Sequence, residues 1–314
     1  MKTKNNINNS PLIWYGIKQT LKLNKGLIIF FNIFWVFIVT FFAGFSLIIG
    51  ASSQNVTAFG LSYVITPGNR LGSENIIAPS TAVGYLICST LGLLVFSIFS
   101  IAMLNKILFS EIKNNKITIW LSTNLSRYKI FIVKFSSVFI MNVTAAVSEL
   151  IPLFIILLCC KDVQSIYFFK IIFQELNLLW VVAFVMLLFT LIFFYKESRS
   201  LLNSLFSIFI VVVIILYFIR LIAAQYSDNN NSSFNNIGQF AQKIDISNLI
   251  VDLFQKNDDQ KQLISTDNAN KTYIFGLKKV NALHYILLFF SVNGLSSLMF
   301  YLNIKIFANR DYNI

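Results

Sequence analysis

The chain has 314 residues, of which 56% are hydrophobic and only 12% are charged, and its mean hydropathy is +0.71. Soluble domains carry about 25% charged residues, so this composition excludes a soluble globular protein and indicates an integral membrane protein. The formal net charge is +12, but the lysines and arginines stand at the ends of apolar runs instead of in one contiguous block. We therefore interpret them as signals of membrane topology and expect membrane lipid, not nucleic acid, as their partner.

Residues 1–26 precede the first long apolar run and are predicted to form a cytoplasmic tail that ends in an amphipathic helix. Helical spacing places Trp14, Ile17 and Leu21 on one face, whereas three lysines occupy another face. Such a helix would lie in the membrane interface, with its apolar side chains among the headgroups and its lysines near anionic lipid. The alternative is a basic juxtamembrane tail.

The rest of the chain contains six apolar runs of the length that a helix needs to cross a bilayer, about 20 residues. They comprise residues 27–50, 84–108, 130–159, 177–195, 201–225 and 284–307. The first run is too long for the apolar part of a signal peptide, so we expect it to remain as a span. The predicted fold is an all-α integral membrane protein with six transmembrane helices. Residues 27–225 hold spans one to five, and residues 284–314 hold span six and the C-terminus.

The distribution of basic residues predicts the orientation of these spans. With the N-terminus inside, most of the 25 lysines and arginines fall in the short inner segments, whereas many of the outer ones are spread through the long segment 226–283. Short loops rich in Lys and Arg stay in the cytoplasm. We therefore expect a multi-pass protein of the plasma membrane with both termini in the cytoplasm.

Three segments between the spans are predicted to lie outside. Residues 51–83 contain prolines and glycines and are expected to be irregular. The stretch "IYFFKIIFQEL", which begins at Ile166, is either a helix at the outer interface or an early start of the fourth span. Residues 226–283 are predicted to form an extracellular loop or small subdomain. Its apolar residues at helical spacing are Ile246, Leu249, Ile250 and Leu253.

Polar residues inside the predicted spans are candidates for a translocation path. Glu149 lies three residues before Pro152, where an ionised carboxylate is costly unless it is paired or hydrated. It is either a path or proton-linked carboxylate, or a paired or protonated residue beside a proline-loosened turn. Asn142 is the second candidate for the path, although interhelical hydrogen bonds would explain it, Asn203 and Asn293 equally well.

The segment 111–124, between spans two and three, is unusually polar for this chain. Ile117, Trp120 and Leu121 are spaced at i, i+3 and i+4, which predicts a short amphipathic helix across the membrane surface. Ser126 is expected to be the N-cap of the third span, with Thr123 as the competing choice. A basic inner loop that only sets topology is the alternative, but it does not account for the apolar face.

This stretch resembles the coupling region in the permease subunits of type-2 ABC transporters. That family shows an acidic residue, Gly-Thr, a leucine-rich turn, Thr-Pro, a small aliphatic residue, Ser-Arg, and a Lys seven residues after the Arg. The matching positions are Glu111, Trp120, Leu121, Thr123, Leu125, Ser126, Arg127 and Lys134. The chain departs from the pattern at Asn115 and Lys116, which replace Gly-Thr, and at Asn124, which replaces the proline. The C-terminal "IFANRDYNI" is also similar to the family's ending.

The resemblance implies a membrane permease subunit of an ATP-driven transporter, working as an exporter. ATP and Mg²⁺ would be bound by a separate ATP-binding cassette subunit that contacts the coupling helix, and a second permease copy or related permease would complete the assembly. The chain itself would bind no cofactor and catalyse no reaction, because it contains no nucleotide-binding loop or hydrolase motif, and its cysteines and single histidine predict no metal site. The alternatives are an ion-gradient-driven transporter that uses Glu149, a membrane enzyme, or a non-catalytic scaffold. An enzyme should show a titratable cluster at one interface, which the sequence lacks.

Overall fold

The computed structural model describes residues 10–51, 56–58, 61–63, 90–122, 125–158, 165–196, 198–226, 237, 240–241, 246–249 and 282–309; for some residues near segment ends it describes the backbone only. Within these residues, six helices are long and apolar enough to cross a membrane, which confirms the prediction of a helical multi-pass protein. The candidate spans are Lys25–Phe42, Gly92–Lys113, Arg127–Ile155, Ile171–Lys196, Arg199–Ile219 and Ile286–Asn309.

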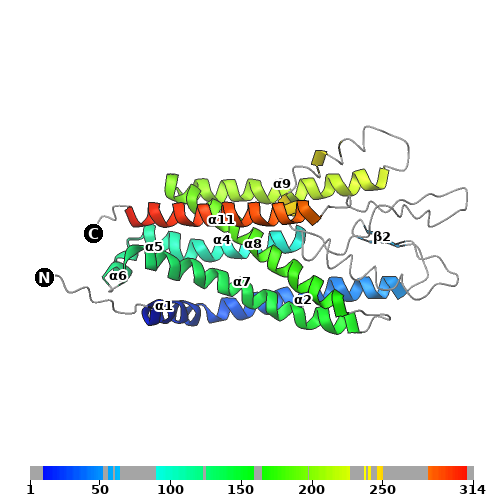
Figure 1. Cartoon of the computed structure of the whole chain (residues 1–314), viewed down its shortest axis with the longest axis horizontal. Coiled ribbons are helices and arrows are strands. Elements are labelled where there is room, and N and C mark those ends of the chain that lie inside the picture. The colour runs from blue at the N-terminus through cyan, green and yellow to red at the C-terminus, as the bar shows by residue number, and fades with distance from the viewer. Residues whose placement is uncertain are drawn as a thin grey trace, which may run out of the picture.

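The long helices lie side by side along the long axis of the molecule (Figure 1). In chain order they are α2 (Lys25–Ala51), α4 (Gly92–Leu104), α7 (Arg127–Leu158), α8 (Ser165–Lys196), α9 (Arg199–Tyr226) and α11 (Ala282–Asn309), and the shorter helix α1 (Ser10–Leu23) precedes α2. Helix α7 packs against α1, α2, α4, α8 and α11, whereas α8 packs against α4, α7, α9 and α11. These two helices therefore form the centre of the bundle, and α2 and α9 lie at its margins.

Aromatic side chains form much of the packing between helices. Phe31 of α2 stacks on Phe99 of α4 with ring centroids 3.7 Å apart, and Trp35 meets Phe96 edge-on at 5.2 Å. The chain contains 33 phenylalanines, so these contacts take the place of the small-residue interfaces that many membrane helices use. In lipid, this close packing, together with interhelical hydrogen bonds, is what holds the bundle together.

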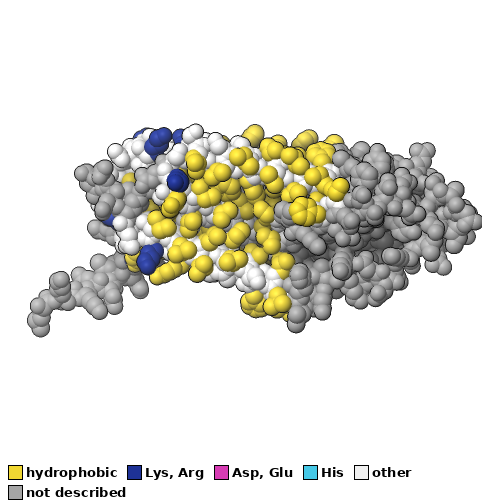
Figure 2. Space-filling view, turned by 90° about the horizontal axis from the view of Figure 1, so that it is seen from above, with side chains coloured by type: hydrophobic (Ala, Val, Ile, Leu, Met, Phe, Trp, Pro, Cys, Tyr) yellow, Lys and Arg dark blue, Asp and Glu magenta, His cyan; other side chains and the backbone are white. Residues whose placement is uncertain are grey.

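The marginal helices present apolar surface to the outside of the bundle. Only 11% of the candidate span in α9 is buried inside the molecule, against 67% of that in α8. Figure 2 shows the resulting apolar band around the middle of the described surface, with lysine and arginine side chains gathered at one end. This pattern suits a bundle whose waist lies in hydrocarbon.

One end of the bundle, called the basic end below, carries α1, the end of α11 and the connection between α4 and α7 (Figure 1). Every lysine and arginine whose side chain the structure describes belongs to a segment at this end. The charge asymmetry on which the predicted orientation depends is therefore present in the fold, although which side of a membrane this end faces stays a prediction.

The second span continues beyond α4 through the π-helical segment η2 (Asn105–Phe109) into α5 (Ser110–Lys113). A π-helical segment widens the helix by one residue per turn and places side chains at angles that an α-helix does not reach. Asn105, at its start, donates to Oδ1 of Asn203 on α9 at 3.5 Å. The π-helical segment η2 lies directly before the predicted coupling region, residues 111–124.

The structure shows two features of the segments between spans that the sequence left open or did not predict. Helix α8 begins at Ser165, so "IYFFKIIFQEL" is the early start of span four and not a separate interfacial helix. The segment 51–83, expected to be irregular, contains the strands β1 (Val56–Ala58) and β2 (Leu61–Tyr63), which pair antiparallel with Val56 opposite Tyr63. Val56 and Thr57 are β-branched and Tyr63 is aromatic, and these residue types favour strands.

Most of the predicted subdomain 226–283 lies outside the described residues. The described part includes a 3₁₀ helix, η4 (Ile246–Leu249), whose Ile246 and Leu249 pack against the core. The carbonyl oxygen of Leu249 accepts a hydrogen bond from Nδ2 of Asn177 on α8 at 3.5 Å. This turn therefore lies against the end of the bundle opposite the basic end, whereas Ile250 and Leu253 are outside the described residues.

Candidate functional site

The predicted coupling region consists of two short helices separated by a tight turn. Helix α5 ends at Lys113, and α6 (Ile117–Leu121) begins after the turn, so the expected helix over 111–124 is broken. Asn115 in the turn has φ of 53°, the left-handed conformation that glycine favours and that asparagine tolerates best among other residues. Asn115 stands where the resembled pattern has glycine, and it adopts a conformation that glycine favours.

The apolar face of α6 points into the bundle. Ile117 is only 1% exposed, and Trp120 and Leu121 are partly buried against the core. The exposed side of α6 carries Ile119, 67% exposed, and is continued by Ser122. The amphipathic pattern thus exists as predicted, but the three residues expected to meet a partner contact the chain's own helices.

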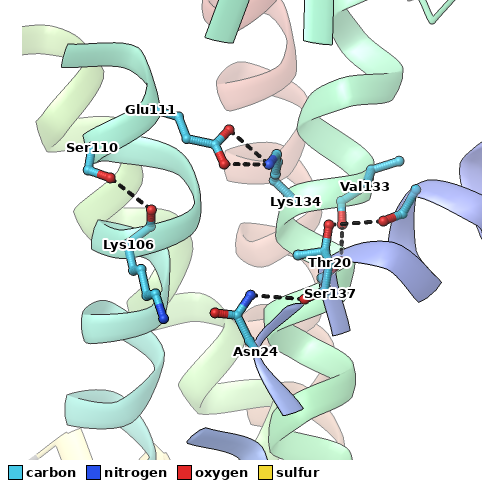
Figure 3. A network of polar contacts seen from close by, with 9 residues as sticks. Thr20, Asn24, Lys106, Ser110, Glu111, Val133, Lys134 and Ser137 are labelled. Carbon is cyan, nitrogen blue, oxygen red and sulfur yellow. Dashed lines mark hydrogen bonds and ion pairs between the residues drawn. The ribbon is translucent and has the colours of Figure 1, made fainter. Parts of the chain in front are cut away.

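Two residues of the family pattern form a buried ion pair. The ammonium group of Lys134 on α7 lies 2.9 Å from Oε1 and 2.8 Å from Oε2 of Glu111 on α5, and Lys134 is 1% exposed (Figure 3). The same ammonium group lies 4.0 Å from the ring centroid of Trp120, a distance suited to a cation–π contact. One buried lysine therefore joins α5, α6 and α7.

Helix α1 packs closely against this junction. A Cβ atom at Gly16 would lie 3.1 Å from Cγ1 of Val133 on α7 and 3.6 Å from Cζ3 of Trp120, so only glycine fits without displacing a neighbour. One and two turns further along, the hydroxyl of Thr20 donates to the carbonyl of Gly16 and the amide of Asn24 donates to the carbonyl of Thr20 (Figure 3). These bonds within α1 satisfy the polar groups that face α7.

The residues chosen from the α1 sequence have different environments. Ile17 is buried and Leu21 is partly buried against the core, whereas Trp14 is 62% exposed. Ile17 and Leu21 therefore contact protein, and Trp14 remains on a surface where lipid headgroups could meet it. The helix itself forms as predicted, over Ser10–Leu23.

The start of α7 is fixed to the end of α11. The carbonyl of Ser126 accepts hydrogen bonds from the backbone N–H groups of Lys129 and Ile130, so Ser126 occupies the N-cap position. Arg127 donates from Nη1 to the carbonyl of Ala308 at 3.4 Å, which places a cation at the negative end of the α11 dipole. Thr123 lies outside the described residues.

The two candidates for a translocation path lie on the inward face of α7. Asn142 is fully buried and donates to Oγ of Ser100 on α4 at 2.8 Å and to Sδ of Met186 on α8 at 3.7 Å. It therefore acts as an interhelical link. Asn203 is linked across helices to Asn105, whereas Asn293 donates to Phe289 in its own helix.

Glu149 lies two turns beyond Asn142, near the far end of the bundle from the coupling region. It is 0% exposed, and its carboxyl group interacts with that of Glu175 on α8, which is 3% exposed. Glu175 is not among the candidates that the sequence indicates, because the start of span four is ambiguous there. The buried residues Ile171, Gln174, Glu175 and Leu178 follow helical spacing, which is the signal that could have identified it.

No protein-family model matches this chain, and no curated protein matches it significantly. Among the described residues, no group of three or more His, Cys, Asp or Glu side chains is placed to hold a metal ion. The functional assignment must therefore be argued from the arrangement of the described residues.

Proposed function

We propose that this chain is the membrane permease subunit of an ATP-driven transporter, working as an exporter, with ATP and Mg²⁺ bound by a separate ATP-binding cassette subunit. The observation that carries the proposal is the α5–α6 tip. It is a surface-exposed turn at the basic end that is joined through buried contacts to two further elements of the bundle, α7 and α1. A loop that only sets topology needs charge at this position but no buried ion pair or close glycine contact.

The surface that the partner would contact is the exposed side of the tip. Its described exposed residues are Lys113, Asn114, Asn115, Lys116, Ile119 and Ser122. One exposed apolar side chain ringed by polar and basic groups suits a groove with an apolar floor and an acidic rim. Ile117, Trp120 and Leu121 would act from behind this surface, as the packing that holds the tip to the bundle.

Movement of the tip would reach the spans by two routes. A displacement of α6 acts on α7 through Trp120 and Lys134, because Lys134 contacts both the Trp120 ring and the Glu111 carboxylate. It acts on α1, and through α1 on α2, at the contact between Trp120 and Gly16. ATP binding at the partner would thus bias the spans between two states, provided that the partner contacts the tip differently in each state.

The assembly would contain two permease subunits and two ATP-binding subunits. One chain has six candidate spans, and the large apolar surfaces of α2, α9 and α11 are free to contact lipid or a second permease, either an identical copy or a related chain. The exposed Trp14 and the lysines of α1 would anchor the basic end among lipid headgroups on the cytoplasmic side.

Co-purification from native membranes, followed by an ATPase assay, tests the proposal. We expect an ATP-binding subunit to accompany the chain, and Ile119→Glu to abolish both the association and the ATPase activity of the complex. Tyr195→Glu is the matched control, because Tyr195 is a 78% exposed aromatic residue near the C-terminus of α8, outside the tip. It should leave the association intact.

Co-purification combined with transport assays distinguishes the ATP-driven permease from a secondary transporter and from a scaffold. Absence of an ATP-binding subunit, together with uptake or efflux driven by an ion gradient alone, would favour the secondary transporter that uses Glu149. Association that survives Ile119→Glu and Lys116→Glu together would show that the tip is not the docking surface. Retention of partners without any transport in reconstituted vesicles would favour a scaffold.

A further inference from the structure

Three hydrogen-bonding side chains are buried in the part of the bundle where α2, α4 and α7 lie together (Figure 1). Trp35 of α2, Ser97 of α4 and Asn142 of α7 are each 0% exposed. Each has one polar atom without a hydrogen-bond partner among the described residues: Nε1 of Trp35, Oγ of Ser97 and Oδ1 of Asn142. The large majority of buried polar atoms in proteins are hydrogen-bonded to protein or to ordered water. Three unpartnered atoms on neighbouring helices therefore indicate a bound polar group.

Contacts between the helices place these side chains around one turn of α4. The ring of Trp35 meets the ring of Phe96 edge-on, with the centroids 5.2 Å apart. The side-chain amide of Asn142 donates to Oγ of Ser100 at 2.8 Å. Ser97 follows Phe96 and stands three residues before Ser100, a spacing at which side chains are neighbours on a helix surface. The three unpartnered atoms therefore border the same turn of α4.

The hydrogen-bonding roles of the three atoms match those of a hydroxyl group. An indole N–H only donates, an amide oxygen only accepts, and a serine hydroxyl does either. The hydroxyl of Ser100 already donates to the carbonyl of Phe96 at 2.6 Å, so it accepts from the amide nitrogen of Asn142 and leaves the amide oxygen free. A hydroxyl group accepts one hydrogen bond from Trp35 and donates another to Asn142.

The surroundings of the three side chains favour a neutral ligand over an ion. The sequence of α4 contains no charged residue, and α2 carries one, Lys25, ten residues before Trp35. On α7 the charged residues that flank Asn142 are Lys134 and Glu149, each about two helical turns away. The thioether of a methionine is what α8 presents to Asn142. An ion buried there would lack a close counter-charge, whereas a hydroxyl group needs only hydrogen bonds.

We propose that Trp35, Ser97 and Asn142 form a binding site for a neutral hydroxyl group, either a water molecule or the hydroxyl of an alcohol that enters from the membrane. The indole of Trp35 donates to the hydroxyl oxygen, and the hydroxyl donates to Oδ1 of Asn142. Oγ of Ser97 provides a third hydrogen bond. Buried water molecules make about three hydrogen bonds, the number that these atoms supply. The site is separate from the coupling tip and does not require the ATP-driven function.

Nuclear magnetic resonance of the full-length protein in lipid nanodiscs, with ¹⁵N in its tryptophan side chains, tests the proposal. Replacing Trp14, Trp120 and Trp180 with Phe, one at a time, assigns their indole resonances and leaves that of Trp35 by elimination. We expect a cross-peak between the indole N–H of Trp35 and water. A water-soluble gadolinium chelate should broaden the resonance of the exposed Trp14 and leave that of Trp35 sharp, which excludes contact with bulk water.

Decanol and decane distinguish a water molecule from an alcohol. Both dissolve in the bilayer, but only decanol carries a hydroxyl group. If an alcohol binds, decanol should replace the water cross-peak of Trp35 with cross-peaks from its own protons beside the oxygen, whereas decane should change nothing. A water cross-peak that survives in decanol would identify water as the bound hydroxyl group.

Two substitutions test the other members of the site. Asn142→Leu and Ser97→Ala should each shift the indole resonance of Trp35 and weaken or abolish its water cross-peak. Ser291→Ala is the control, because the hydroxyl of Ser291 is exposed and donates within α11, and it should leave the Trp35 resonance unchanged.

Three outcomes would overturn the proposal. They are a Trp35 resonance without a cross-peak to water or decanol, a water cross-peak that is unchanged in both Asn142→Leu and Ser97→Ala, and a water cross-peak that decane removes as well as decanol. If the substituted chains do not fold, the cross-peaks of the unsubstituted protein with water, decanol and decane decide the question.

Discussion

Buried charged side chains have opposite neighbours at the two ends of the bundle: a lysine meets a carboxylate at the basic end, and two acidic side chains meet at the opposite end. At the basic end, the ammonium group of Lys134 has a carboxylate at 2.8 Å and an aromatic face at 4.0 Å. At the other end, the fully buried carboxyl group of Glu149 interacts with a second acidic side chain, Glu175. The carboxylate of Glu111 compensates the charge of Lys134 and holds α5 against α7, whereas two neighbouring carboxyl groups repel one another when both are ionised. The difference indicates a rigid joint at the basic end and an electrostatic cost at the opposite end.

The largest expected effect comes from breaking the ion pair at the basic end. Glu111→Gln leaves Lys134 buried without its counter-ion, and we expect a loss of about 3 kcal/mol in the free energy of unfolding. Lys134→Met should cost less, because Glu111, with a 23% exposed side chain, can reach water when its partner is removed. Unfolding in mixed micelles measures both values.

The control for this comparison is Lys196→Met, which removes an exposed lysine at the same end and should change stability by less than about 0.5 kcal/mol. Joint replacement by Leu at position 111 and Met at position 134 should recover most of the lost stability, because an apolar pair needs no counter-ion. Equal losses in Glu111→Gln and Lys196→Met would show that the joint is not held by charge.

The close contact of α1 offers the next test of rigidity at the basic end. In Gly16→Leu the new side chain must displace Val133 or Trp120, since even its Cβ would lie 3.1 Å from Val133. Overpacking of this kind costs about 1–3 kcal/mol. Gly26→Leu is the matched control, because a Cβ at Gly26 meets no atom within 4 Å. Gly16→Leu should therefore lower the melting temperature more than Gly26→Leu does. Equal melting temperatures in the two variants would contradict close packing of α1 on α7.

A smaller effect is expected at the turn of the coupling tip. Asn115→Val places a β-branched residue at φ of 53° and should cost about 1–2 kcal/mol, whereas Asn115→Gly should be neutral or slightly stabilising. Asn114→Val is the control, because the φ of Asn114 is −91°, on the negative side that L-residues ordinarily adopt. Melting temperatures check the stability order, and loss of ATPase coupling in Asn115→Val alone would tie the turn to function. If both valine variants behave alike, the left-handed turn is not a constraint.

The sequence predicts the spans well because span length and apolar content are set by the thickness of the membrane, a constraint that acts locally. It also predicts the clustering of lysines at one end. It does not predict the inward direction of α6, because spacing at i, i+3 and i+4 defines a face but not what that face meets. The pairing of Glu111 with Lys134 depends on the reversal at Asn115, and the meeting of Glu149 with Glu175 depends on the packing of α7 on α8. Both pairings depend on tertiary contacts, which no local sequence pattern encodes.

The smallest expected effect concerns Asn142, which lies on α7 between the two ends and links it to α4 and α8 through Ser100 and Met186. Replacing it with Ala removes interhelical hydrogen bonds, for which membrane proteins show about 0.6 to 2 kcal/mol. Asn293→Ala is the control, because the amide of Asn293 donates within its own helix and its loss should cost less. Unfolding free energies in mixed micelles would measure the difference. If Asn142→Ala instead leaves stability unchanged and lowers transport, Asn142 belongs to the translocation path. The rigid packing of the basic end would then extend along α7 only as far as Lys134 and would not include Asn142.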